Sequence, residues 1–148
     1  MDTKKHLCST DAALLVLRLA LGAIFILHGY GKVFGHMPSM EMFSGMVSKI
    51  GFPMPGFFAW VAALTEFAGG IAILLGICTR VAGPFIAFEM FVTTVFVKKF
   101  LFPAADEDLA LFAIAIAITL MGPGCYSLAK ALKWKMLDAS VEETPVAA

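Results

Sequence analysis

An apolar segment with one carboxylate at its centre constrains the fold of this chain more than any other feature. Residues 57–77 form a continuous apolar stretch in which Glu66 is the one charged residue. A helix needs about 20 such residues to cross a bilayer. The whole chain is 60% hydrophobic and 15% charged, whereas soluble domains are roughly 45–50% apolar and about 25% charged. The sequence therefore predicts an integral membrane protein in which residues 57–77 form one spanning helix.

Glu66 lies in a stripe of small residues. The positions at helical spacing around it are Ala59, Ala62, Ala63, Gly69 and Gly70. Small residues line the faces on which membrane helices pack closely, so Glu66 is expected to point into a helix bundle and not toward lipid. Burying a carboxylate there costs about 2.5 kcal/mol or more on insertion scales. Glu66 is therefore either part of a functional site or one half of a structural charge pair.

Three further apolar segments complete the predicted architecture. With spans at 12–34, 57–77, 81–99 and 107–122, we expect an all-α, four-helix membrane bundle with up-down-up-down order. The single membrane domain covers residues 12–128, between a mobile N-terminus (1–11) and an amphipathic or disordered tail (129–148). No small-residue cleavage site follows the first apolar stretch, which predicts a retained helix and not a signal peptide. Residues 40–50 alternate apolar and polar residues at helical spacing, which predicts a short amphipathic helix in the first outer loop.

The distribution of basic residues favours one orientation. Four spans place both termini on one side, which would carry seven lysines and arginines against four on the other. The positive-inside rule then predicts cytoplasmic termini in the inner (cytoplasmic) membrane, with Arg18 reaching toward the cytoplasmic headgroups. Cys8, Cys78 and Cys125 would all face the reducing cytoplasm. This placement argues against a disulfide-forming enzyme, which needs paired cysteines on the outer side.

Four polar residues inside the spans are candidates for ligand binding or proton exchange. At about 1.5 Å per residue, Glu66 and Glu89 lie near the midplane, His28 lies toward the outer side, and Lys32 lies one turn beyond it. These residues would converge on one outward-opening pocket. In the alternative interpretation they neutralise each other across helix interfaces, His28 binds a backbone carbonyl, and Lys32 extends to the membrane surface.

The sequence gives little support for other classes of site. The cysteines form no CxxC pair and no metal-ligand spacing, and we predict no metal site. Methionines are concentrated in the first outer loop, where they suit an interfacial helix better than a copper site. The net charge is zero, so nothing indicates nucleic-acid binding.

Three motifs occur in order along the chain. The first helix contains Arg18 and ends in His28-Gly29-Tyr-Gly-Lys32. The second hairpin contains Glu66-Phe-Ala-Gly69-Gly70 and then Thr79-Arg80, and the fourth span leaves through Gly122-Pro123-Gly124-Cys-Tyr-Ser127-Leu128. Over residues 14–130 this pattern resembles the DoxX family of small four-helix membrane proteins. The resemblance implies structural roles for Arg18, Gly29, Gly69, Gly70, Arg80, Gly122, Pro123 and Gly124. The family's last motif usually continues into an Asp, whereas Ala129 stands there in this chain.

The resemblance also suggests a function. Some members are described as the membrane subunit of a thiosulfate:quinone oxidoreductase, and others as partners of soluble redox enzymes in oxidative stress. We therefore expect a redox-linked subunit that binds a quinone through Glu66 and His28, with apolar walls from residues 81–99. Because the sequence shows no flavin, haem or iron–sulfur site, a protein partner would carry the redox centre, and the chain would not be a complete enzyme.

Two other functions stay open. They are a small-solute permeation protein and a non-catalytic membrane anchor for partner proteins. Small-residue faces on the second and fourth spans, the latter formed by Ala110, Ala113 and Ala117, would permit a homodimer.

Overall fold

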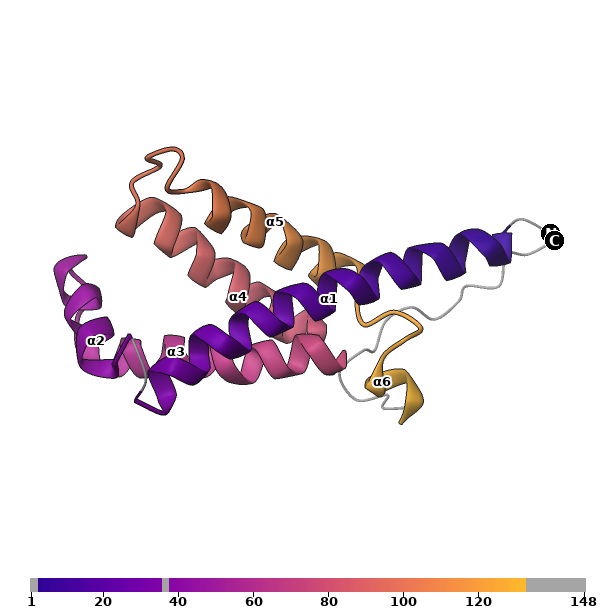
Figure 1. Cartoon of the computed structure of the whole chain (residues 1–148), viewed down its shortest axis with the longest axis horizontal. Coiled ribbons are helices and arrows are strands. Elements are labelled where there is room, and N and C mark those ends of the chain that lie inside the picture. Colours follow the sequence, from indigo (N-terminus) through magenta and orange to yellow (C-terminus); the bar gives the residue numbers. More distant parts are fainter. Residues whose placement is uncertain (1–2, 36–37, 133–148) are drawn as a thin grey trace.

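The structure, a computed structural model, describes residues 3–35 and 38–132. Its helices are α1 Thr3–Val33, α2 Met40–Lys49, α3 Pro55–Leu75, α4 Thr79–Val92, the π-helix η1 Thr93–Val97, α5 Asp106–Met121 and α6 Leu128–Ala131. The long helices run back and forth, with α2 at one end of the bundle and α6 toward the other (Figure 1). No strand occurs in the described ranges, and the predicted all-α fold is confirmed for them.

Three helical segments are long and apolar enough to cross a membrane. They are Ser9–Val33, Pro55–Leu75 and Thr79–Val97. The fourth predicted span corresponds to α5, which has 16 residues and so a length of about 24 Å, against about 30 Å for the hydrocarbon core. The fourth span and the orientation in the membrane therefore stay predictions.

The helix ends differ from the expected ones for local reasons. α1 begins at Thr3, so it includes residues that the sequence assigned to the N-terminal segment. α3 starts at Pro55, where proline suits the first helical turn, and ends at Leu75, after which the capping residue Gly76 has a left-handed φ of 71°. α5 takes Asp106, Glu107 and Asp108 into its first turn, where carboxylates stabilise the positive end of the helix dipole.

Glycines allow α1 and α3 to cross closely. A Cβ on Gly22 would lie 2.7 Å from the Cβ of Leu74, and a Cβ on Gly29 would lie 2.7 Å from the Cα of Phe67. From the other side, a Cβ on Gly70 would lie 2.8 Å from the backbone nitrogen of Ile26. No side chain larger than hydrogen fits at these three positions without moving the helices apart. The resemblance-based structural roles of Gly29 and Gly70 thus have a steric basis.

The buried core runs along the bundle between the two helical pairs α1–α3 and α4–α5. Its members are apolar residues from α1, α3, α4 and α5, namely Leu14, Leu21, Phe25, Ile73, Ile86, Ala87, Met90, Leu111, Ala115 and Ile118. Large side chains such as Leu27, Phe88 and Leu120 are exposed, as expected where helices face lipid tails.

The small-residue face predicted on the fourth span is largely exposed. On α5, Ala110 and Ala113 are exposed and Ala117 is half-buried, so most of this face is not covered by other helices of the chain.

The two short helices begin with serine caps. The hydroxyl of Ser39 accepts a hydrogen bond from the Met42 amide at the start of α2, and that of Ser127 accepts one from the Lys130 amide at the start of α6. α2 occupies the connection between α1 and α3, where the sequence predicts an amphipathic helix. Residues 133–148, which include most of the predicted basic and acidic tail, lie outside the described residues.

Candidate functional site

A buried ion pair joins α1 to α3. The ammonium of Lys32 donates to Oε1 of Glu66, and the two residues are only 9% and 3% exposed. Glu66 lies on the predicted small-residue face, on which Ala59, Ala63 and Gly70 are also buried. The prediction that Glu66 points into the bundle is therefore confirmed. Lys32 turns inward as well, so the interpretation that it extends to the membrane surface is wrong.

Glu89 on α4 brings a third charged group to this pair. Its carboxyl group interacts electrostatically with both Glu66 and Lys32. One oxygen of each carboxyl group, Oε2 of Glu66 and Oε2 of Glu89, is buried without a hydrogen-bond partner. We call Lys32, Glu66 and Glu89 the buried charge cluster. It places two carboxyl groups against one ammonium, and the hydrogen bond between the two carboxyl groups requires a proton on one of them.

An aromatic ring from α2 covers the ammonium group of Lys32. The Nζ of Lys32 lies 4.0 Å from the centroid of the Phe43 ring, a distance at which a cation is attracted to the ring face. This contact was not foreseen, because Phe43 belongs to an apolar stripe that the sequence assigns to the membrane surface. The helical spacing of Phe43 within α2 does not indicate which residue of α1 its ring will contact.

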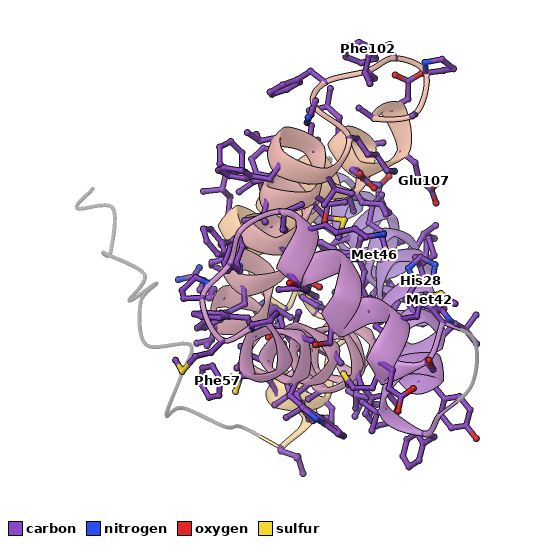
Figure 2. All side chains as sticks on the ribbon, turned by 90° about the vertical axis from the view of Figure 1, so that its left-hand side faces the viewer. His28, Met42, Met46, Phe57, Phe102 and Glu107 are labelled. Atoms are coloured by element: carbon purple, nitrogen blue, oxygen red, sulfur yellow. The ribbon has the colours of Figure 1, made fainter. Side chains whose placement is uncertain are left out.

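The structure does not bring His28 to the buried charge cluster. His28 lies one helical turn before Lys32 on α1, yet its side chain is exposed. Viewed from the α2 end, it lies at the edge of the molecule (Figure 2). The phenylalanines that flank Glu89 in the sequence, Phe85 and Phe88, are also exposed. They do not form the walls around Glu89 that helix spacing alone would allow.

The helix that carries Glu89 changes its hydrogen-bonding pattern one turn later. The hydroxyl of Thr93 donates to the carbonyl of Glu89 at 3.0 Å, and that of Thr94 donates to the carbonyl of Met90 at 2.8 Å. The π-helix η1 begins at Thr93. Short π-helical segments are rare and occur frequently at functional sites. Two adjacent threonines in an apolar helix were the available signal, but threonine pairs are too common to predict a π-helix.

Arg18 lies inside the protein, so the prediction that it reaches the headgroups is wrong. It is 1% exposed. Its guanidinium donates to four backbone carbonyl groups, those of Ile73 (3.0 Å), Leu74 (3.1 Å), Pro123 (2.6 Å) and Tyr126 (3.0 Å). The first two belong to the last turn of α3, where carbonyl groups lack the usual helical partners; the carbonyl of Ile73 also accepts a hydrogen bond from the amide of the capping residue Gly76 at 3.1 Å. Arg18 therefore ties the end of α3 to the loop after α5.

The loop after α5 also packs against the motif residue Arg80. The side chain of Arg80 lies against Gly122, where a Cβ would be 3.2 Å from Nε. Gly122 and Gly124 both have left-handed φ values, 75° and 68°. At its exposed end, Lys130 donates to the Sγ of Cys125 at 2.9 Å, and this hydrogen bond raises the pKa of Lys130 above its ordinary value. The loop is thus a structural junction at the end of the bundle opposite α2.

Comparisons with known proteins agree with the motifs. The DoxX family model matches residues 13–99. The chain is 30% identical over 131 residues to "Inner membrane protein YqjF" of Escherichia coli, covering 84% of this chain and 96% of that protein. It is 31% identical over 116 residues to "Putative oxidoreductase CatD" of Bacillus subtilis, covering 77% and 82%. It is 29% identical over 135 residues to "Uncharacterized membrane protein Rv3486" of Mycobacterium tuberculosis, covering 81% of each chain. No solved structure matches this chain.

Proposed function

Because this chain belongs to the DoxX family of integral membrane proteins, we propose that it is a membrane subunit of a quinone-linked redox system. The observation that supports this proposal is the buried charge cluster, in which Oε2 of Glu66 and Oε2 of Glu89 have no hydrogen-bond partner. Buried polar atoms in proteins are nearly always hydrogen-bonded. Two carboxyl groups that interact with each other and with one ammonium inside a membrane bundle suit a site that takes up protons or binds a polar headgroup.

The residues of the cluster have the donors and acceptors that a quinone headgroup needs. A bound quinone would supply an acceptor of two electrons and two protons. The ammonium of Lys32 has three N–H donors, of which one is directed to Glu66. Glu66 and Glu89 can hold and release protons within the apolar bundle. Electrons would come from a protein partner that carries the redox centre.

The name of one relative supports this assignment at the level of the reaction class. The relative from Bacillus subtilis carries the name "Putative oxidoreductase CatD", and the one from Escherichia coli the name "Inner membrane protein YqjF". We infer that this chain also lies in the inner membrane, with both termini in the cytoplasm and with α5 as a short fourth span. A reporter that is active only in the cytoplasm, fused after Ala148, is expected to be active. Activity of the same reporter inserted between residues 36 and 39 would contradict this orientation.

Quinone binding by the purified chain in detergent tests the proposal. We expect saturable binding that weakens about tenfold or more in Glu66→Gln and in Glu89→Gln, since a hydrogen bond to a charged group contributes about 1.5–3 kcal/mol. His28→Ala is the matched control, because His28 is exposed on the same helix as Lys32, and it is expected to bind like the wild type. Equal binding by all four proteins would contradict the site.

The same variants separate the two alternatives. A permeation protein predicts that proteoliposomes carry a solute flux which Glu66→Gln and Glu89→Gln change, without saturable quinone binding. A non-catalytic anchor predicts that both variants still recover the partner proteins and restore the in-cell phenotype. Isolation of the full chain with its bound proteins would also identify the source of electrons.

A further inference from the structure

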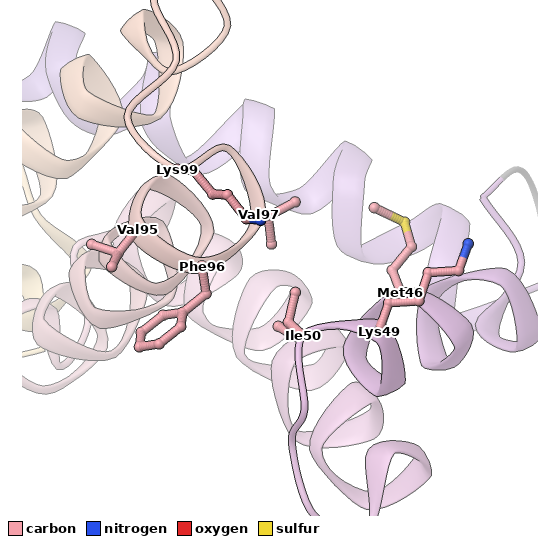
Figure 3. Close-up of a pocket in the computed structure, with 7 residues that line it drawn as sticks. All are labelled: Met46, Lys49, Ile50, Val95, Phe96, Val97 and Lys99. Carbon is pink, nitrogen blue, oxygen red and sulfur yellow. The ribbon is translucent and has the colours of Figure 1, made fainter.

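A cavity separate from the buried charge cluster lies between α2 and η1. Its volume is about 600 Å³, and its walls come from the end of α2 and from the segment that follows α4 (Figure 3). The lining residues are Met46, Lys49, Ile50, Val95, Phe96, Val97 and Lys99. This volume lies within the range of small-molecule sites in proteins, about 300–1,000 Å³.

The cavity combines apolar walls with two cations. Five of its seven lining residues are apolar, the other two are Lys49 and Lys99, and no acidic residue lines it. Both lysines are exposed, and neither forms an ion pair with any residue in the described part of the chain. The neighbouring Lys98 differs, because its Nζ lies 2.9 Å from Oδ2 of Asp108. The site is therefore complementary to a ligand with an anionic end and an apolar body.

The backbone on the η1 side of the cavity is irregular. After the π-helix, Lys99 and Phe100 have left-handed φ values of 50° and 54°. Residues other than glycine rarely adopt this region, and bulky ones least of all. In this conformation Lys99 extends alongside Val97 at the cavity (Figure 3). Strained backbone of this kind persists where the surrounding structure fixes it, and it is frequent at ligand sites.

The position of the cavity indicates where its ligand comes from. Val97 is the last residue of the candidate span Thr79–Val97, so the cavity lies where hydrocarbon meets headgroups. Phe96, Phe100 and Leu101 are exposed in this segment. Exposed apolar side chains suit contact with lipid, whereas a site that binds an anion from water does not require them. At this depth, the anionic amphiphile available in quantity is a phospholipid of the bilayer itself.

We propose that the α2–η1 cavity binds the headgroup of an anionic phospholipid, with Lys49 and Lys99 on its phosphate and with Ile50, Val95 and Phe96 against its glycerol and upper acyl carbons. The lipid would connect α2 to the end of the third span at the membrane surface. The proposal does not depend on quinone binding, since no residue of the buried charge cluster lines this cavity.

Lipid preference of the full-length protein tests the proposal. The chain is purified in a nonionic detergent and mixed with equal amounts of phosphatidylglycerol and phosphatidylcholine of the same acyl chains, and bound lipid is counted by native mass spectrometry. Each lysine near a membrane surface favours anionic lipid by about fivefold. We expect the preference for phosphatidylglycerol to fall roughly fivefold in Lys49→Gln or Lys99→Gln and about thirtyfold in the double variant.

Two controls keep the outcomes distinct. Lys130→Gln removes an exposed lysine at the other end of the molecule and is expected to keep the wild-type preference. The double variant Lys49→Arg with Lys99→Arg retains both charges and is expected to keep most of it, which also separates lost charge from lost folding. An unchanged preference in Lys49→Gln/Lys99→Gln would overturn the proposal. Competition by millimolar inorganic phosphate would overturn the lipid assignment in favour of a soluble anion.

Discussion

Replacing Arg18 by Met removes the donor that ties the end of α3 to the loop after α5. The guanidinium donates to the carbonyl groups of Ile73 and Leu74 at the end of α3, and to those of Pro123 and Tyr126 in the loop after α5. Methionine fills a similar volume without any N–H group. All four carbonyl groups would lose this donor; the bond to Ile73 is buried, and those to Leu74, Pro123 and Tyr126 are partly buried.

The size of the effect follows from these four bonds. A net contribution of about 1 kcal/mol for each hydrogen bond gives about 4 kcal/mol. The variant is also relieved of burying a cation, which offsets part of this loss. We expect Arg18→Met to lower the free energy of unfolding by about 3 kcal/mol, which is a large fraction of the roughly 5–15 kcal/mol that stabilises a typical domain.

Unfolding in mixed micelles measures this change. Helical content is followed by circular dichroism as sodium dodecyl sulfate displaces a nonionic detergent, for the wild type and for Arg18→Met. Arg18→Lys keeps the charge but has a single nitrogen that must donate to carbonyl groups on two segments. Its stability is therefore expected to lie between those of the wild type and Arg18→Met. Lys49→Met removes an exposed cation and is expected to change stability by less than about 0.5 kcal/mol. A loss below about 1 kcal/mol in Arg18→Met would refute the reasoning.

The same assay tests the other contacts. Gly29→Ala is expected to cost about 1–3 kcal/mol, because its methyl group would meet the Phe67 backbone; Gly45→Ala, which meets nothing within 4 Å, is expected to stabilise α2 by about 0.5–1 kcal/mol. A comparable loss in both would show that the α1–α3 crossing is not the cause. Lys32→Met is expected to cost about 3–5 kcal/mol, since it leaves a buried carboxylate without its cation, and adding Glu66→Gln should recover part of that loss. Additive losses in this double variant would contradict a direct interaction between the two side chains.

Features that depend on one helix at a time could be predicted from the sequence. The length and composition of residues 57–77 predicted α3, and the alanines and glycines around Glu66 predicted its direction, because both follow from helical periodicity. α2 covers Met40–Lys49, within the stretch 40–50 that has amphipathic spacing, whereas its place in an outer loop stays a prediction. The predicted fourth span begins at residue 107 and α5 begins at Asp106, a small difference that arises because carboxylates in the first turn of an apolar helix look the same as loop residues in a sequence.

Features that depend on which helices meet could not be predicted in the same way. Arg18 is near the end of a predicted span, where most arginines reach the headgroups. Arg18 lies inside the protein because the loop at residues 122–126 folds back against the end of α3. His28 and Lys32 share a face of α1 by spacing, yet only Lys32 is covered, because Phe43 of α2 lies over it. The α2–η1 cavity depends on an irregular backbone for which the sequence offers no clear signal.

The buried charge cluster links these observations to function through its charge balance. Within it, one ammonium faces two carboxyl groups, so the cluster is electrically neutral only when it also holds one proton. A structural ion pair would need Glu66 alone, and replacing Glu89 by an apolar residue would spare the bundle the cost of burying a second carboxyl group. Glu89 instead adds a second buried carboxyl group, whose hydrogen bond to Glu66 requires a proton on one of the two acids, directly before the turn in which the helix changes to η1. A surplus acid beside a π-helix is costly for stability alone, but it is what a site that exchanges protons with a bound ligand requires.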